Sequence, residues 1–97
     1  MEANYTQAGE ALKVIGHPRR IAIILLLSKF PQLKVKEIAK KLQINPSVVS
    51  QHLMLLKNEK VIESRPRGKT RLYSLTNQTL AKIVNDLLEV LEVLEVQ

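Results

Sequence analysis

The chain has 97 residues with 45% hydrophobic content, no cysteine, and 15 Lys or Arg against nine Asp or Glu, a net charge of +6. These values fit one folded domain, residues 1–97, and exclude disulfides, thiolate metal sites and cysteine nucleophiles. The longest apolar run, residues 21–27, is far shorter than the ~20 residues of a membrane span. The first residues also lack a secretion signal, so we expect a cytoplasmic protein that does not enter a membrane.

Two helices are predicted in the first third of the chain. The first covers residues 5–15, where apolar side chains recur at helical spacing: Tyr5, Ala8, Ala11, Leu12 and Ile15. Gly16 ends this helix, and Pro18 suits the first turn of a second helix that runs to about Lys29. Residues 21–27 are apolar on nearly every side of the second helix, which predicts that it is the central buried one.

A helix-turn-helix follows. Residues 34–42 form a short helix whose buried face is Val35, Ile38, Ala39 and Leu42. After a turn over residues 43–45, Asn45 is a favourable N-cap and Pro46 fits the first position of a helix that runs to Glu59. That helix is predicted to bury Val49, Leu53 and Leu56 and to present on its other face Ser47, Ser50, Gln51 and Met54.

The remaining elements are a hairpin and a last helix. Two β-type runs, residues 61–65 and 70–75, flank a predicted turn, Pro66-Arg67-Gly68-Lys69. The last helix covers residues 77–96 and has a heptad seam formed by Leu80, Val84, Leu87, Leu91 and Leu94. Val90, Val93 and Val96 add a second apolar stripe beside the seam. This is more apolar surface than one surface helix buries in its own domain, which predicts a homodimer.

Positive charge is concentrated in the middle of the sequence. Residues 34–71 hold ten Lys or Arg and three Glu, a balance of +7, whereas the rest of the chain balances to −1. Charge gathered on one structural unit indicates a polyanionic partner. Together with the helix-turn-helix pattern, it predicts binding to double-stranded DNA.

Three stretches resemble the ArsR/SmtB family of winged-helix repressors. They are Leu12-Lys13-Val14-Ile15-Gly16-His17-Pro18-Arg19-Arg20, the helix-turn-helix over residues 35–53, and the wing strand Gly68-Lys69-Thr70-Arg71-Leu72-Tyr73-Ser74-Leu75. The resemblance covers about residues 8–96 and implies a mainly α winged helix-turn-helix fold with one small β-hairpin. It further implies a repressor that binds an inverted-repeat operator as a homodimer whose first and last helices pair. Tyr5 and Leu12 would thereby join the interface.

The predicted DNA contacts fall into two groups. Base reading is assigned to the residues near the start of the second helix of the motif, with Gln51 as the main reader: Ser47, Val48, Ser50 and Gln51. Contacts to phosphate or to a minor groove are assigned to Lys34, Lys36, Arg65, Arg67, Lys69 and Arg71. For His52, a phosphate contact and a packing role are both open, whereas for His17 we expect capping or packing.

The sequence departs from the family at its metal sites. The resemblance implies ligands at residues 33–36 and at four positions of the last helix, but the latter are Asn77, Thr79, Val90 and Val93. Lysine is cationic at neutral pH and valine has no lone pair, so we expect no metal and no cofactor. Carboxylates on the last helix are an alternative site for a hard metal ion, although we interpret them as a solvated face: Asp86, Glu89, Glu92 and Glu95.

Two other classes of protein are possible in principle. An enzyme is not expected, because the chain has one Asp, two His, no Cys and no phosphate-binding glycine loop. A winged helix that docks on another protein remains an alternative, motivated by Met54 and Leu55 on the second helix of the motif. The sequence leaves open a small-molecule or protein effector, the operator and the sign of regulation.

Overall fold

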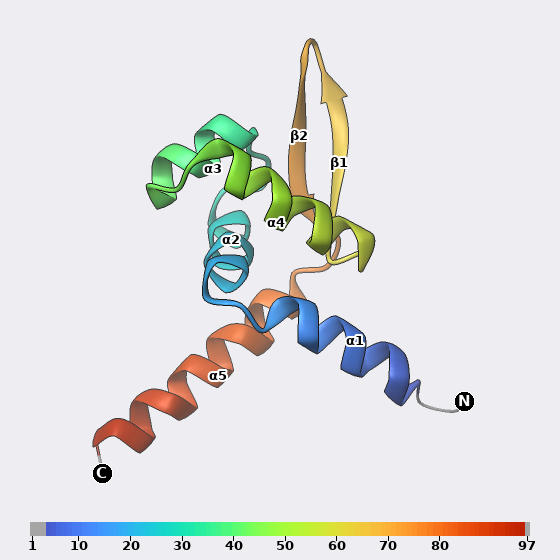
Figure 1. The fold of residues 1–97 in the computed structure, drawn as a ribbon. Helices are drawn as coiled ribbons and strands as arrows, with labels where there is room; N and C mark the ends of the chain where they lie inside the picture. Colours follow the sequence, from blue (N-terminus) through green and yellow to red (C-terminus); the bar gives the residue numbers. More distant parts are fainter. Residues whose placement is uncertain (1–3, 97) are drawn as a thin grey trace.

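The computed structural model describes the backbone of residues 4–96 and the side chains of residues 4–92. Its elements follow the predicted order of four helices, a hairpin and a last helix (Figure 1). Their bounds are α1 (Tyr5–Ile15), α2 (Pro18–Lys29), α3 (Val35–Leu42), α4 (Pro46–Asn58), β1 (Ile62–Arg67), β2 (Thr70–Leu75) and α5 (Thr79–Val96). The predicted helices over residues 5–15 and 18–29 are confirmed at both ends, and the other three agree within two residues.

Helix α2 is the centre of the core, as its apolar composition predicts. Ile23, Ile24 and Leu27 are fully buried, and α2 contacts α1, α3, α4, α5 and β2. Burying one such side chain contributes roughly 1.5–3 kcal/mol. The other helices and the hairpin are therefore arranged around α2, and they add most of the remaining buried apolar residues.

The helix-turn-helix packs through the predicted residues. Ile38 and Ala39 of α3 are buried, and so are Val49, Leu53 and Leu56 of α4. Between the helices, Gln43 adopts the left-handed conformation with φ 55°. The backbone N–H of Ile44 donates a hydrogen bond to the carbonyl of Ala39. This tight C-terminal turn closes α3 and sends the chain directly into α4.

The hairpin differs from its prediction. Residues 66 and 67 were expected in the turn, but β1 continues through them and pairs Pro66 with Arg71 and Arg67 with Thr70. The turn is therefore only Gly68-Lys69, with Gly68 at φ +61°. Pro66 is tolerated because a two-stranded sheet has only edge strands, where a missing N–H need not break the ladder. The wing is longer and narrower as a result.

A short bridge ties the hairpin to the start of α3. The N–H of Leu33 donates to the carbonyl of Tyr73 at 3.1 Å, and the N–H of Tyr73 donates to the carbonyl of Leu33 at 2.8 Å. Leu33 is buried and lies just before α3. The two backbone bonds therefore fix the position of β2 relative to the first turn of α3.

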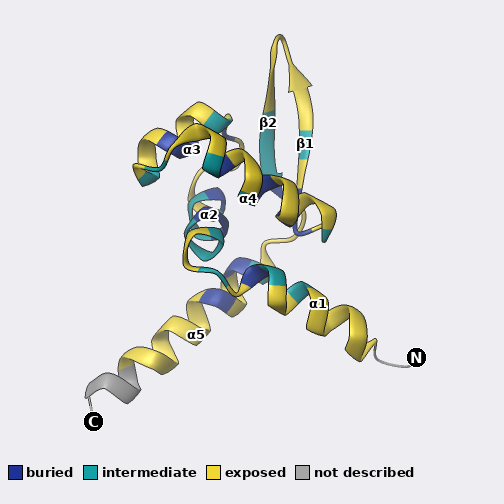
Figure 2. Ribbon diagram, in the orientation of Figure 1, coloured by how far each residue is buried: buried dark blue, intermediate teal, exposed yellow. Residues whose placement is uncertain are grey.

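Helix α5 divides into a packed part and a projecting part. Its first turns lie against α2, where Ala81 and Val84 are buried, and beyond them the helix runs out from the body (Figure 2). Val84, assigned to the dimer interface, is only 5% exposed and belongs to the core of its own chain. Val84 therefore acts in the core of its own chain, because the first turns of the leucine seam hold α5 on α2. No helix in the described part of the chain is long and apolar enough to cross a membrane.

Candidate nucleic-acid interface

The start of α4 is held by a cap. Asn45 Oδ1 accepts hydrogen bonds from the backbone N–H of Ser47 at 2.9 Å and from the Ser47 hydroxyl at 2.8 Å. Pro46 occupies the first helical position, which needs no N–H donor. The cap fixes the first turn of α4, and the Ser47 oxygen keeps lone pairs that can accept a hydrogen bond from outside.

The predicted reading residues lie on the outer side of α4. Ser47, Ser50 and Gln51 are exposed, and Met54 is exposed beside them, whereas Val48 is half-buried. In the described part of the chain, neither Ser50 nor Gln51 makes a side-chain hydrogen bond. Gln51 thus presents both a donor and an acceptor to a partner, the pair that binds adenine in a bidentate contact.

His52 lies on a different side of α4, against His17. The two ring centroids are 4.7 Å apart, and the His52 ring is half-buried with its Nδ1 lacking a hydrogen-bond partner. Burial lowers the pKa of His52, and nearby positive groups lower it further: His17, Arg20 and Arg19. Of the two roles left open by the sequence, this environment favours packing. His17 acts as the expected cap, since its Nδ1 accepts from the N–H of Arg19 at 3.1 Å.

The wing carries its four cations in two different settings. Arg65 donates to Gln32 Oε1 at 2.9 Å, and Arg71 Nε donates to the Ser64 hydroxyl at 2.9 Å. Arg67 and Lys69, at the tip, are exposed and make no side-chain hydrogen bond within the described residues. The guanidinium groups of Arg65 and Arg71 are therefore held in position, whereas the tip cations are available to a partner. The Gln32 contact spans 33 positions in the sequence, and no local pattern could have revealed it.

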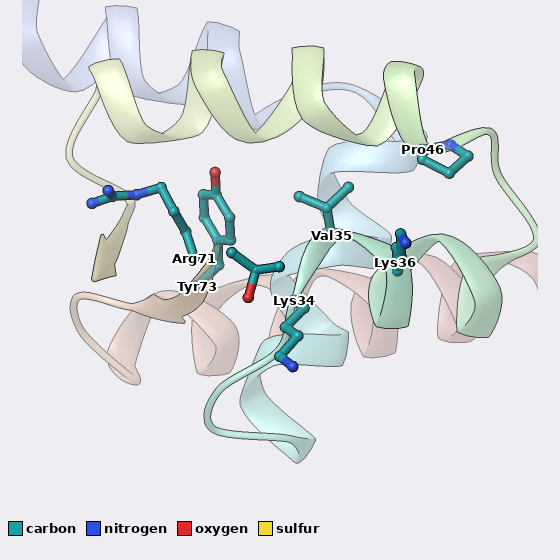
Figure 3. Close-up of a pocket in the computed structure, with 7 residues that line it drawn as sticks. Lys34, Val35, Lys36, Pro46, Arg71 and Tyr73 are labelled. Atoms are coloured by element: carbon teal, nitrogen blue, oxygen red, sulfur yellow. The ribbon is translucent and has the colours of Figure 1, made fainter. Parts of the chain in front are cut away.

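Lys34 and Lys36 line a pocket together with residues of the wing (Figure 3). Lys34 precedes α3, and its backbone N–H donates to the Glu37 carboxylate at 2.8 Å. The pocket has a volume of about 310 Å³, and its lining also includes Val35, Pro46, Thr70, Arg71 and Tyr73. Sequence reasoning assigned the cations individually but missed the pocket, because three separate segments form it.

A second surface lies on α1 and α5, at the end of the molecule opposite the wing (Figure 1). Tyr5, Leu12, Leu87 and Leu91 are exposed, whereas Leu80 is half-buried against the core. The predicted interface residue Leu94 lies outside the described side chains. Between these helices lies an apolar groove of about 170 Å³, lined by Leu12, Ile15, Gly16, Ile21, Leu80, Ile83, Val84 and Leu87. Both helices thus leave apolar surface uncovered in one chain.

Metal-binding side chains do not gather in the described residues. There, no group of three or more His, Asp or Glu is placed to hold an ion. Asp86, one of the carboxylates of the alternative metal site, instead accepts from Lys82 Nζ at 3.0 Å in a surface ion pair.

Known proteins share this fold and sequence. The model of the family described as bacterial regulatory protein, arsR family, matches residues 17–64. The HTH-type transcriptional regulator YgaV of Escherichia coli K12 is 31% identical over 84 residues, which are 87% of this chain and 85% of YgaV. The chain belongs to the ArsR family. It is thus a transcriptional regulator of the ArsR/SmtB type with a DNA-binding helix-turn-helix.

Two further relatives extend the comparison. The HTH-type transcriptional repressor SmtB of Mycobacterium tuberculosis H37Rv is 40% identical over 81% of this chain, which spans 58% of SmtB. The solved structure of HlyU from Vibrio cholerae N16961 has a TM-score of 0.76 and 29% identity, with full coverage of both chains. In sequence, this chain is 32% identical to the V. cholerae protein named transcriptional activator HlyU, over 87% of this chain and 77% of HlyU. The winged helix-turn-helix predicted from the sequence is confirmed.

Proposed function

We propose that this ArsR-family protein is a homodimeric repressor that binds an inverted-repeat operator through α4 and the wing. The observation that carries the proposal is the exposure of Gln51 on α4 together with free cations at the wing tip. The chain would act as one domain, since a single core cluster draws residues from α1 to α5. The described chain has no helix that could cross a membrane, in keeping with a cytoplasmic site of action.

Each part of the surface has a proposed role in DNA binding. Gln51 reads a base in the major groove, with Ser47, Ser50 and Val48 beside it. The cations of the wing contact phosphates or a minor groove: Arg65, Arg67, Lys69 and Arg71. At the start of α3, Lys34 and Lys36 contact phosphates. His52 is not included, because its ring packs on His17.

The dimer is proposed from the uncovered apolar surface. Leu87 is 52% exposed and Leu91 is 46% exposed, on the part of α5 that projects beyond the body. Tyr5 and Leu12 add exposed apolar area on α1. Exposed apolar side chains gathered on one surface often mark protein interfaces. A two-fold pairing of these helices would set two copies of α4 one helical turn of DNA apart, ~34 Å.

A second candidate is a winged helix that docks on another protein. The exposed side chains of Met54 and Leu55 on α4 favour it, since exposed apolar residues often mark protein contacts. The two functions differ in their response to salt. DNA binding through ~6–10 phosphates would fall by ~10³–10⁵ between 50 and 200 mM salt, whereas an apolar contact would hardly change.

The decisive experiment compares two duplexes at low and physiological salt, one from upstream of the protein's own coding region and one of random sequence. Binding to the upstream duplex that persists at physiological salt, while binding to the random duplex disappears, supports a site-specific regulator. Footprinting then gives the operator, and transcription with the purified protein gives the sign of regulation. Weak and equal binding to both duplexes would contradict the proposal and favour the protein-docking function. The sign of regulation differs among the relatives, since one is named a repressor and one an activator.

A further inference from the structure

The pocket between α3, α4 and the wing differs in character from the rest of the DNA-facing surface. Its lining is almost wholly apolar, formed by Val35, Pro46, the Tyr73 ring and the carbon atoms of the remaining residues (Figure 3). A phosphate would be bound by the charged ends of the basic residues and gains nothing from an apolar lining. Binding to the DNA backbone therefore does not account for the apolar interior.

Basic residues stand around the rim of the same pocket and contribute their carbon atoms to its lining. Three of its seven lining residues are Lys34, Lys36 and Arg71, and none is acidic. The nearest carboxylate in sequence, Glu37, accepts from the Lys34 backbone N–H and lines a different hollow with Lys40 and Lys41. Among the described residues, none of the three cations is in an ion pair. Charge complementarity thus points to a ligand with an apolar body and a negative end.

The pocket is formed in advance of any ligand. The two backbone hydrogen bonds between Leu33 and Tyr73 fix the wall made by β2 against the start of α3. Arg71 is held by Nε to the Ser64 hydroxyl and by its Nη2 to the Ser64 carbonyl. Pro46 adds a ring with a fixed backbone angle. A rigid, largely apolar cavity with a few placed charges is typical of small-molecule sites, and about 310 Å³ lies at the small end of their range.

We propose that this pocket binds a small aromatic carboxylate and that the ligand weakens DNA binding. The aromatic body would lie on Tyr73, Val35 and Pro46, with the carboxylate toward the cations of the rim. The effect on DNA rests on the proposed function, in which Lys34, Lys36 and Arg71 contact phosphates. A bound carboxylate would neutralise part of that charge and occupy space between α4 and the wing.

The first arm of the test omits DNA. The full-length ¹⁵N-labelled protein is titrated with 2-naphthoate, and in parallel with 2-naphthalenemethanol and with acetate, while amide shifts are recorded. We expect saturable shifts for 2-naphthoate at Val35, Thr70 and Tyr73, and much weaker effects from the alcohol and from acetate. Equal binding of the alcohol would overturn the role of the charge. Shifts confined to the α1–α5 groove, or no saturable shift at millimolar concentration, would overturn the site.

Two substitutions and a matched control sharpen this arm. Lys34→Ala and Arg71→Ala are each expected to weaken 2-naphthoate binding roughly two- to fivefold, as for partly exposed ion pairs. Lys40→Ala removes an exposed cation of α3 outside the pocket and is expected to leave binding unchanged. Lys34 is exposed and its hydrogen bond to Glu37 uses the backbone, so Lys34→Ala is expected to fold. Equal affinity in all three variants would overturn the assignment.

The second arm adds DNA. Saturating 2-naphthoate is expected to raise the dissociation constant for an operator duplex, and acetate at the same concentration is expected to have no such effect. If 2-naphthoate binds in the pocket but leaves DNA affinity unchanged, the effector role is overturned. If no duplex binds at any salt concentration, the proposed function fails, and the first arm still decides the pocket.

Discussion

The imidazole ring of His52 lies 4.7 Å from the ring of His17, at an angle of 46°. The contact joins α4 to the loop between α1 and α2, so it helps to set how α4 lies on the body. Burial lowers the pKa of His52 below the ordinary value of 6.5, and the positive groups around the ring lower it further. A proton on His52 therefore opposes folding.

Stability is expected to fall at mildly acidic pH because of His52. The unfolded chain takes up a proton near pH 6.5, and the folded chain does so only at lower pH. The contribution is therefore complete above pH 6.5 and is lost as the pH falls toward the folded pKa. Urea denaturation at pH 7.5 and 5.5 should show a smaller pH dependence for His52→Gln than for the wild type. His17→Asn, which keeps a capping oxygen, should retain most of the wild-type dependence. An unchanged pH dependence in His52→Gln would contradict this prediction.

The Asn45 cap can be separated from DNA binding. Asn45→Ala removes the acceptor for the Ser47 N–H and hydroxyl and should lower the free energy of unfolding by ~1 kcal/mol. Asn45→Asp keeps an acceptor and should be close to wild type in stability. Near phosphates, however, its charge is expected to weaken DNA binding. Urea denaturation and fluorescence anisotropy measure the two effects, and full DNA affinity in Asn45→Asp would place the start of α4 away from the backbone.

Gln51 is expected to carry base specificity. Gln51→Ala should weaken binding to the operator by ~1–3 kcal/mol and leave binding to random duplex nearly unchanged, because the amide side chain reads a base. Gln51 is exposed, so the folded structure should not change. Met54→Ala on the same exposed side is the matched control, since it changes the surface but removes no hydrogen-bonding amide. Equal weakening on operator and random DNA would mean that Gln51 contacts the backbone.

The wing tip is expected to act through charge alone. Arg67→Ala and Lys69→Ala should each weaken binding to every sequence and reduce the slope of log K against log salt by ~0.9 for each phosphate that the variant no longer binds. Lys82→Ala, on α5, removes a cation that already pairs with Asp86 and should leave the slope unchanged. The slope is measured by anisotropy titrations over a series of salt concentrations. Weakening confined to one sequence would show that the wing reads bases.

The two halves of the α5 seam should respond differently to substitution. Leu87→Glu with Leu91→Glu places charge on exposed positions and should give folded monomers with weak operator binding. Val84→Ala removes two buried carbons and should lower the free energy of unfolding by roughly 2 kcal/mol. It should leave the dimer intact, since Val84 faces the core. Light scattering and circular dichroism test both, and a dimeric double variant would exclude α5 from the interface.

Much of the fold follows from local chemistry in the sequence. Pro18 and the pair Asn45-Pro46 mark where helices begin, because a cap or a fixed φ acts on its own neighbours. The continuous apolar composition of residues 21–27 identified the central helix, because a helix that is apolar on all sides must be covered. The exposed side of α4 was likewise predictable, since helical spacing separates Gln51 from Leu53.

Only the tertiary structure decided which partner covers each apolar or basic residue. The apolar residues of the leucine seam recur at the same spacing along the whole of α5. However, α2 covers Val84 and leaves Leu87 exposed. The bond between Gln32 and Arg65 and the bridge between Leu33 and Tyr73 join distant segments. Three segments form the pocket behind Lys34, and that bridge holds two of them together. Periodicity in a sequence predicts the face of a helix or strand on which a side chain lies. Long-range packing determines whether another element or solvent contacts that face.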